Sequence, residues 1–424
     1  MPTIRFAYGA GHVEKEISES RHLAELVSQM HHYVPEHSQE ELVRRALQNP
    51  IGSPSLGELS SGKKNIVIID SDHTRPVNSK IILPPMLEEI RAASPDAEIT
   101  ILISTGTHRA TTHEELVAKF GADIVRDETI VIHDSDNSPM VHVGTLPSGG
   151  KVILNQVAVE AELVIGVGFI EPHFFAGYSG GRKSVFPGIT DRRSVAYNHN
   201  AEFISHPNAR AGILDGNPIH IDMLHAARLC KLAFICNVIV NAEKEIVHAV
   251  AGHMEEAHLA GVEFLKDRCK AEAVPADIAI TTNGGYPLDQ NLYQAVKGMT
   301  AAEATVRKGG VIIMMARTND GHGGESMYKT FNEEKSLEKL MESFLNTPKE
   351  ETLIDQWQSQ ILTRILLHAH VVYVSEAPDD LVENFQMIPA KTLDEALEIA
   401  EDLLKNPEAS ITSIPDGVSV MVVR

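Results

Sequence analysis

Short apolar runs that end in polar loops recur along the first half of the chain. NIVIID (65–70) is followed by SDHTRP, AEITILIS (97–104) by TGTHRAT, and ELVIGVGF (162–169) by a long loop that begins with IEPHFF. Runs of this length and β-branched content predict strands buried on both faces, and capping-box spacing at 112–115 predicts a helix after the second loop. Strands that alternate with helices predict a parallel sheet, whose ligands bind at the carboxyl ends of the strands. All three polar loops fall at that edge.

The alternation continues in the second half of the chain. Residues 232–253 predict two strands joined by a turn, and a helix follows through about residue 270. KAEAVPAD then breaks the pattern, before DIAITTNGGYPLDQNLYQAVKG predicts a strand, a glycine-containing loop and a helix. Further strands are predicted at GGVIIMMA, VVYVSE and VSVMVV, and a helix is predicted at 393–404.

The length of 424 residues favours more than one domain, since a typical domain has roughly 150 residues. The apolar fraction of 43% and the charged fraction of 22% are typical of a folded globular protein. We therefore expect two α/β domains with mainly parallel sheets and an active-site cleft between the domains. The expected domains are residues 1–272 and 273–412, and the chain end at 413–424 is a candidate to return to the first.

The chain is acidic, with 58 acidic and 37 basic residues and a formal net charge of −21. Such a charge repels nucleic-acid backbones and anionic lipids, so we expect neither a nucleic acid nor a membrane as a partner. The start of the chain has no cationic segment followed by an apolar one, and no apolar run reaches the roughly 18 residues of a membrane span. The pattern disfavours secretion and indicates a cytoplasmic protein.

The cysteines and histidines narrow the search for chemistry. Cys230, Cys236 and Cys269 form no CxxC motif and are expected to be buried structural residues. Histidine occurs 21 times, and it is the side chain whose unperturbed pKa lies closest to neutrality. No HExxH motif occurs, because the two glutamates after His113 are not followed by a second histidine. A zinc hydrolase is therefore disfavoured.

The segment GYSGGRKS (177–184) is similar to a phosphate-binding loop of the type GxxxxGK[ST]. Arg182, however, occupies the position where that motif requires glycine, which disfavours a nucleoside triphosphatase. The glycines still allow a ligand to approach the backbone closely, and Arg182 and Lys183 carry positive charge. We therefore expect this loop to hold a phosphate or another anion.

His108, His173 and His199 lie in polar loops at predicted strand ends or just beyond them. Each one alone would be interpreted as a hydrogen-bonded loop histidine, but their shared place at one sheet edge makes them candidates for chemistry. Asp72 and Arg75 precede a helix, where they form either an anion-binding site or a helix cap beside a solvated arginine.

The second half of the chain adds three further candidates. Gln294 and Lys297 are three residues apart and share a helix face, for which solvated surface is the alternative interpretation. Trp357, the single tryptophan of the sequence, belongs either to the core or to an apolar wall of the cleft.

Five segments, taken together, resemble the nickel-dependent lactate racemase family: SDHTRP, STGTHR, EPHFFAGYSGGRKSVFPGI, YNHN and GGYPLDQNLYQAVKG. The resemblance extends over essentially the whole chain, and the third and fifth segments are the most specific. It implies that residues 1–272 bind a nickel-pincer nucleotide. This cofactor is a pyridinium mononucleotide with two sulfur-containing arms, joined to a lysine through a thioamide, and it holds nickel by two sulfurs and one ring carbon.

The resemblance also implies residue roles, carried over position by position. Lys183 corresponds to the lysine that forms the thioamide, and His199 to the histidine that completes the nickel coordination. His108 and His173 correspond to the general acid and base. The implied substrate contacts come from Asp72, Arg75, Tyr293, Gln294, Lys297 and Trp357, and those to the nucleotide phosphate from Thr74, Gly106 and Gly181.

The implied function is a racemase that interconverts D- and L-lactate. Removal of the C2 proton would leave a carbanion beside an ionised carboxylate, whereas hydride transfer to the cofactor, with a histidine taking the hydroxyl proton, avoids it. Nickel with sulfur ligands and an imidazole is typical of a soft, square-planar site. The alternatives are a racemase or epimerase of another 2-hydroxy acid in the same family and a non-catalytic carboxylate-binding protein. The implied partners are a small 2-hydroxy acid and the proteins that make and install the cofactor.

Overall fold

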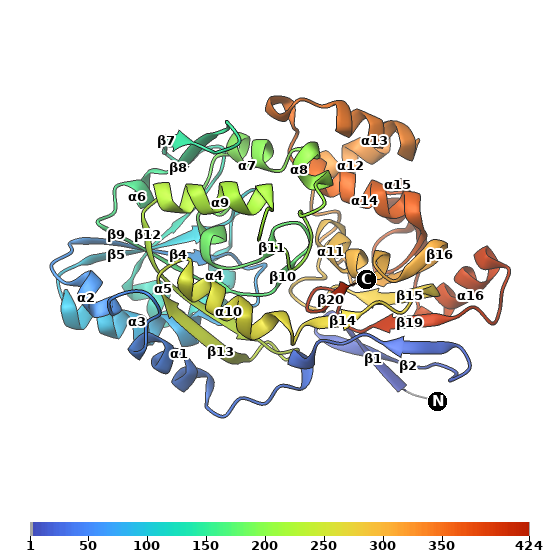
Figure 1. Cartoon of the computed structure of the whole chain (residues 1–424), viewed down its shortest axis with the longest axis horizontal. Helices are drawn as coiled ribbons and strands as arrows, with labels where there is room; N and C mark the ends of the chain where they lie inside the picture. The colour runs from blue at the N-terminus through green and yellow to red at the C-terminus, as the bar shows by residue number, and fades with distance from the viewer. Residues whose placement is uncertain (1–2, 424) are drawn as a thin grey trace. The chain divides into compact units, whose positions relative to one another are not determined.

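The computed structural model describes residues 3–423, and the side chains of all of these except His31 and His32. Contacts between residues group the chain into two compact units. Unit 1 comprises Met1–Gln29, His199–Ser205 and Cys269–Arg424, and unit 2 comprises Met30–Asn198 and His206–Arg268. Each unit is built around its own mainly parallel sheet, with helices packed against it (Figure 1).

The main sheet of unit 2 contains the strands that the apolar runs predict. Among the described residues its strands are β4 (Asn65–Ser71), β5 (Glu98–Ser104), β6 (Thr129–Ile132), β9 (Leu163–Phe169), β12 (Leu232–Val240) and β13 (Ile246–Gly252). They lie in the order β13-β12-β9-β4-β5-β6, and every neighbouring pair is parallel except β12 with β13. All residues of β9 are buried, as expected for a strand covered on both faces.

Helices cover both faces of this sheet. A hydrophobic core joins one face to α1 (Gln39–Gln48), α2 (Leu56–Ser60) and α3 (Ser79–Ala93), and α9 (Pro218–Leu229) and α10 (Glu256–Lys266) lie on the other. Helix α4 (His113–Phe120) begins at the predicted capping box, in which Thr112 and Glu115 satisfy each other's backbone N–H groups. The other elements are η1 (Gln29–His32), α5 (Ala122–Asp127), β7 (Met140–Thr145), β8 (Lys151–Asn155), α6 (Gln156–Val159), β10 (Pro172–His173), β11 (Gly177–Tyr178), η2 (Gly181–Ser184) and α7 (Arg192–Asn198).

The main sheet of unit 1 is parallel throughout its described strands, in the order β18-β17-β16-β15-β19-β3. These strands are β3 (His22–Glu25), β15 (Ala276–Thr282), β16 (Val306–Met315), β17 (His370–Val374), β18 (Ile388–Ala390) and β19 (Ile411–Ile414). A hydrophobic core joins one face to α16 (Leu393–Leu404) and β1 (Thr3–Tyr8), while α11 (Leu292–Glu303) and α14 (Gln356–His368) also pack on the sheet. The remaining elements are β2 (Gly11–Glu16), α8 (Ala201–Ser205), β14 (Lys270–Glu272), α12 (Glu325–Glu333), α13 (Leu337–Asn346), η3 (Lys349–Glu351), α15 (Asp379–Asn384) and β20 (Met421–Val423).

The chain ends differ from the sequence-based expectations. The strand predicted at VSVMVV is shortened to β20, which pairs with β14 and not with the main sheet. On that side of the main sheet, β19 pairs with β15, and β3 forms the edge. The beginning of the chain, expected in the domain 1–272, and its end, a candidate to return there, both group with unit 1. The reason is that β3 pairs with β19 from the opposite end of the chain, which no local pattern encodes. The helix expected through about residue 270 ends at Lys266.

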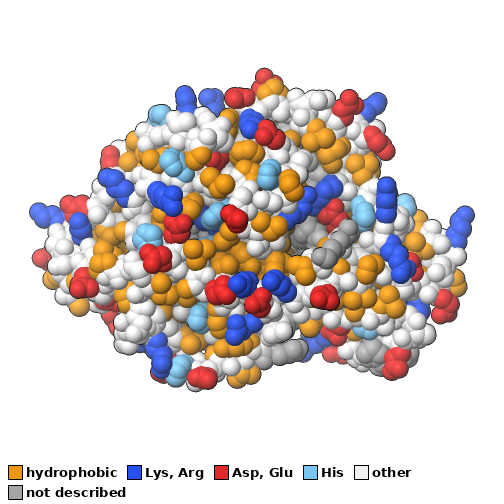
Figure 2. All heavy atoms as spheres, in the orientation of Figure 1, with side chains coloured by type: hydrophobic (Ala, Val, Ile, Leu, Met, Phe, Trp, Pro, Cys, Tyr) orange, Lys and Arg blue, Asp and Glu red, His pale blue; other side chains and the backbone are white. Residues whose placement is uncertain are grey.

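The surface and the interior agree with the composition. Figure 2 shows basic and acidic side chains interspersed over the face that it draws. Cys230, Cys236 and Cys269 are free and buried, which confirms their prediction as structural residues. None of the described helices is both long enough and apolar enough to cross a membrane.

Candidate active site

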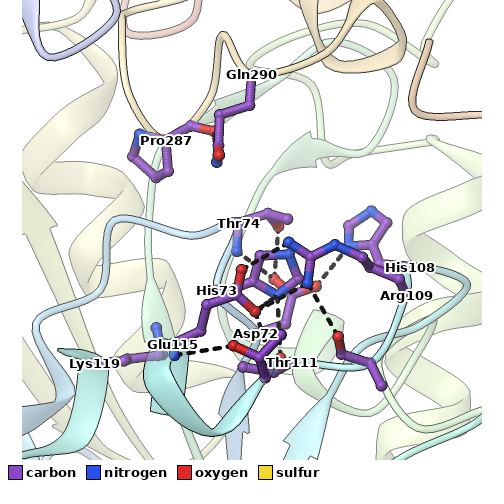
Figure 3. A network of polar contacts seen from close by, with 12 residues as sticks. Asp72, His73, Thr74, His108, Arg109, Thr111, Glu115, Lys119, Pro287 and Gln290 are labelled. Atoms are coloured by element: carbon purple, nitrogen blue, oxygen red, sulfur yellow. Dashed lines mark hydrogen bonds and ion pairs between the residues drawn. The ribbon is translucent and has the colours of Figure 1, made fainter. Parts of the chain in front are cut away.

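Asp72 lies at the centre of a polar network at the carboxyl end of β4 (Figure 3). Its side chain is buried, and its Oδ1 accepts hydrogen bonds from the backbone N–H and the hydroxyl of Thr74, at 3.0 and 2.6 Å. Its Oδ2 accepts a hydrogen bond from Nδ1–H of His108 at 2.6 Å. Arg75 donates to the Thr74 hydroxyl oxygen at 3.0 Å. The loops after β4 and β5 therefore bring these four side chains together.

The carboxylate of Asp72 stays ionised although it is buried. Burial alone would raise its pKa, but the charge and hydrogen bond of His108, the charge of Arg75 and the hydrogen bond from Thr74 outweigh burial and hold the pKa of Asp72 well below its usual range. The anion keeps the proton on Nδ1 of His108. The Nε2 atom of His108 is therefore the nitrogen that can take up and release a proton.

A second group of polar contacts ties the β5 loop to the start of α4 (Figure 3). Nδ1 of His73 lies 3.1 Å from the Thr111 hydroxyl oxygen, and burial lowers the pKa of His73. Both carboxylate oxygens of Glu115 accept hydrogen bonds from Arg109, at 2.9 and 2.7 Å. These contacts fix the conformation of the segment between the end of β5 and the start of α4.

Lys119, in the last turn of α4, holds the backbone of the loop that carries Arg75. Its ammonium donates hydrogen bonds to the carbonyl oxygens of Arg75 and Val77, at 3.4 and 3.3 Å, and to the Ser71 hydroxyl oxygen at 3.1 Å. Asp70 is its buried anionic neighbour: burial raises the pKa of Asp70 and lowers that of Lys119, and their mutual attraction opposes both shifts. Sequence reasoning missed Lys119, because only the fold brings it to this loop.

We expect Lys119→Met to lower the free energy of unfolding by about 3 kcal/mol, since it leaves Asp70 buried without its cationic neighbour. Urea denaturation measures this difference. Lys80→Met, at an exposed position of α3 in the same unit, is the matched control and should change stability by less than about 0.5 kcal/mol. Equal stability of the two variants would contradict a supporting role for Lys119.

The loop after β9 brings His173 and Lys183 together. Nζ of Lys183 lies 3.3 Å from Nε2 of His173 and 5.8 Å from the centre of the Phe175 ring. The backbone N–H of Ala176 donates to Nδ1 of His173 at 3.2 Å. Because an N–H can only donate, Nδ1 is an acceptor here, and Nε2 is the ring nitrogen that faces the Lys183 amine. The two histidines thus differ at Nδ1, which accepts a hydrogen bond in His173 and donates one in His108.

A glycine of β9 allows this loop to approach the sheet. A Cβ atom on Gly166 would lie 2.9 Å from the Ser184 hydroxyl oxygen, so a larger residue would displace η2. Gly181, with φ of +52°, donates its backbone N–H to Oδ1 of Asn237 at 2.7 Å. Glycine at position 166 is therefore explained by the close packing of the Ser184 side chain against the strand.

Arg182 faces the interior of unit 2. Its guanidinium is buried and donates hydrogen bonds to the carbonyl oxygens of Ala176, Tyr178 and Gly180, at 2.7, 2.6 and 3.3 Å. The expectation that Arg182 supplies charge to a bound anion was wrong, because its side chain is buried and both terminal nitrogens of its guanidinium donate to carbonyls of its own loop.

A second set of candidate residues lies in unit 1, around α11 and α14. The indole N–H of Trp357 donates to the Tyr293 hydroxyl oxygen at 2.9 Å, and the Trp357 ring meets the His199 ring edge-on, with 4.8 Å between ring centres. Gln358 donates to the backbone carbonyl oxygen of Tyr293. Gln360 donates to a backbone and a side-chain oxygen of α8. Helix α14 thus positions both Tyr293 and the segment that follows His199.

The structure therefore places the candidate residues in two sets. Unit 2 contains Asp72, Thr74, Arg75, Gly106, His108, His173, Gly181 and Lys183, and unit 1 contains His199, Tyr293, Gln294, Lys297 and Trp357. The expected common sheet edge was wrong for His199, which follows α7 and packs against α14. Gln294 is 4% exposed, which excludes solvated surface for it. Within the described part of the chain, no three or more His, Cys, Asp or Glu side chains are grouped to hold a metal ion.

Two family models match the chain. The lactate racemase N-terminal domain matches residues 8–212, and the lactate racemase C-terminal domain matches residues 271–422. The chain belongs to the lactate racemase family. It is 51% identical to the lactate racemase of Thermoanaerobacterium thermosaccharolyticum, covering 100% of this chain and 99% of that protein. It is 52% identical to the lactate racemase of Lactiplantibacillus plantarum, covering 100% of both chains.

Solved structures agree with this membership. The lactate racemase apoprotein from Thermoanaerobacterium thermosaccharolyticum superposes with a TM-score of 0.93 at 51% identity, covering 100% of both chains. A protein of Thermotoga maritima, 18% identical, has a TM-score of 0.69 over 90% of this chain and 97% of its own. At that identity the second similarity supports the fold alone.

Proposed function

We propose that this protein is a lactate racemase, an isomerase that interconverts D- and L-lactate with a nickel-pincer nucleotide attached to Lys183. The observation that carries the proposal is the 3.3 Å approach of the Lys183 amine to Nε2 of His173, which supports cofactor attachment at Lys183 next to a histidine that could act as acid or base. Similarity to two lactate racemases over the whole chain supports lactate as the substrate.

The residues present fit such a cofactor. Lys183 is half-buried and follows a glycine-rich loop, and His199 offers an imidazole beside the Trp357 ring. A Cβ atom on Gly106 would have only the Pro187 carbonyl oxygen within 4 Å, at 3.6 Å, so there is space for a ligand on this side of Gly106, whose N–H donates to the Gly188 carbonyl oxygen. When bound, the cofactor would supply a hydride acceptor for the C2 hydrogen and a soft nickel site whose coordination His199 would complete.

The backbone N–H groups of the three residues expected at the phosphate already have acceptors: that of Thr74 donates to Asp72, that of Gly106 to Gly188 and that of Gly181 to Asn237. Phosphate binding by Thr74, Gly106 and Gly181 stays a prediction, and the positive φ of the two glycines shapes their loops.

The two histidines can share the work of moving the hydroxyl proton of lactate. Because Asp72 holds the proton of the His108 ring on Nδ1, Nε2 of His108 can act as the base that removes the hydroxyl proton of one enantiomer. Once Lys183 is joined to the cofactor and is no longer an ammonium, Nε2 of His173 would carry the proton of the ring, because Nδ1 accepts from Ala176, and it could donate that proton to the oxygen of the keto acid. Reversal of these two roles gives the opposite direction, which a racemase requires.

Arg75 and Lys297 are the cations that we propose bind the substrate carboxylate. A hydrogen bond to a charged group contributes roughly 1.5 to 3 kcal/mol. Arg75→Ala or Lys297→Ala should therefore raise the KM for lactate at least about tenfold. Arg126→Ala, which removes an exposed arginine of α5, is the control. Unchanged KM and kcat in both test variants would contradict the assignment.

The deciding experiment measures the interconversion of D- and L-lactate by this protein after it has been produced in cells that also contain the cofactor-synthesis proteins. The intact mass is measured first, so that only chain with an adduct on Lys183 is assayed. Interconversion of another 2-hydroxy acid, but not of lactate, would favour the first alternative. Binding of lactate without interconversion by adduct-bearing chain would contradict the proposal and favour a carboxylate-binding protein.

A further inference from the structure

Residues 176–183, here called the lysine loop, turn their carbonyl groups toward two buried side chains. Three of these carbonyl oxygens accept hydrogen bonds from Arg182, as described above. The carbonyl oxygen of Ser179 accepts a hydrogen bond from Nε2–H of His258, on α10, at 2.8 Å. Arg182 is 1% exposed and His258 is 3% exposed. The conformation of the loop is therefore set largely by side chains beneath it.

Both side chains have the protonation state that these contacts need. Burial, with a contribution from the charge of Arg182, lowers the pKa of His258 to about 3, so the ring is neutral and its single N–H is committed to Ser179. Burial lowers the pKa of Arg182 to about 9, which leaves the guanidinium charged near neutrality. A guanidinium carries five N–H donors in a planar fork and can satisfy several carbonyls at once.

These contacts determine where His173 and Lys183 lie. Strand β11, within the lysine loop, pairs with β10, which ends at His173. The N–H of Ala176 orients the His173 ring through Nδ1, and the Ala176 carbonyl oxygen is bound by Arg182. The backbone N–H of Lys183 donates at 3.1 Å to the carbonyl oxygen of Gly180, which Arg182 also binds.

We propose that Arg182 and His258 are positioning residues that hold the lysine loop in the conformation in which the Lys183 amine lies beside His173. This inference rests on the function proposed above, from which Lys183 takes its importance. A packing role alone would not require a charge, because an apolar side chain of similar length fills the same volume without the cost of desolvating a cation. The contribution specific to Arg182 is therefore its set of hydrogen bonds to the loop.

The test compares three variants with the unaltered chain. Arg182→Lys keeps the charge but loses the planar fork, and Arg182→Gln loses both. Ile90→Ala, on the buried face of α3, is the control for general destabilisation, with an expected loss of about 2 to 4 kcal/mol. Hydrogen exchange is measured on cofactor-free chain, and the adduct on Lys183 is measured by intact mass after production with the cofactor-synthesis proteins.

In Arg182→Lys we expect amide exchange within the lysine loop to rise at least about tenfold, as the loss of one charged hydrogen bond predicts. The fraction of chain with an adduct on Lys183 should fall severalfold. The kcat per loaded chain should also fall while the KM for lactate stays unchanged, because Arg75 is not disturbed. Arg182→Gln should show larger changes in the same direction. Ile90→Ala should lose stability without any of these local effects.

Native loop exchange, native adduct formation and native kcat in Arg182→Lys would overturn the inference. If neither Arg182 variant folds, His258→Phe replaces them, because it removes the hydrogen-bond donor to Ser179 without leaving a buried charge unpaired. Unchanged amide exchange of the lysine loop in His258→Phe would also overturn the inference. The exchange measurement needs no cofactor. An unmodified Lys183 in the unaltered chain would therefore count against the proposed function and leave the loop measurement valid.

Discussion

Lys183→Ala should abolish racemisation and remove the covalent adduct from the intact chain. The substitution deletes the amine beside His173, and without it the chain would hold no group that can accept the C2 hydrogen of lactate. Lys183 is half-buried and lies outside the hydrophobic cores, so we expect the variant to stay folded. Intact mass and the rate of D- to L-lactate conversion, measured on the same preparation, check this expectation.

Two further variants distinguish covalent attachment of the cofactor at Lys183 from the positive charge of the Lys183 side chain. Lys183→Arg keeps a cation in the loop but cannot form a thioamide, so it should be as inactive as Lys183→Ala. Lys151→Ala, at an exposed position of β8 in the same unit, should keep both the adduct and the activity. Full activity together with an adduct in Lys183→Ala would show that the attachment is elsewhere.

Lactate labelled with deuterium at C2 should racemise more slowly than unlabelled lactate and yet keep most of its label in both enantiomers. In the proposed mechanism His108 and His173 handle only the hydroxyl proton, so the C2 hydrogen never reaches an imidazole that exchanges with water. Mass spectrometry of the separated enantiomers measures the retained label. Loss of deuterium to solvent in step with racemisation would contradict this mechanism and favour direct proton abstraction at C2.

Variants of the two histidines complete this prediction. His108→Ala and His173→Ala should each lower kcat in both directions by about 10² to 10⁴, the usual contribution of a general acid or base. Asp72→Asn should have a smaller effect of the same kind, since it leaves His108 in place but removes the anion that fixes its tautomer. His142→Ala, on the exposed side of β7, is the control. Full activity in either test variant would exclude that histidine as the acid or base.

The sequence by itself determined the α/β class, the central strands of each sheet and the family. Strands β4, β5 and β9 and the start of α4 are encoded locally, because burial on both faces and a capping box each depend on a few neighbouring residues. The long segment that contains His173 and Lys183 identifies the family because it is continuous in the sequence. The order and spacing of its residues can therefore be compared with the family directly, without knowledge of the fold.

Only the tertiary structure decided the direction of the long arginine and lysine side chains and the contacts between segments that are distant in the sequence. Arg182 and Lys183 are adjacent, and the sequence predicted the same ligand-facing role for both. In the structure the carbonyls of the loop bind Arg182 in the interior, whereas Lys183 lies beside His173. Lys119 and the pairing of β3 with β19 are further examples. In each case the contact joins groups that become neighbours only once the chain has folded, so no local pattern records it.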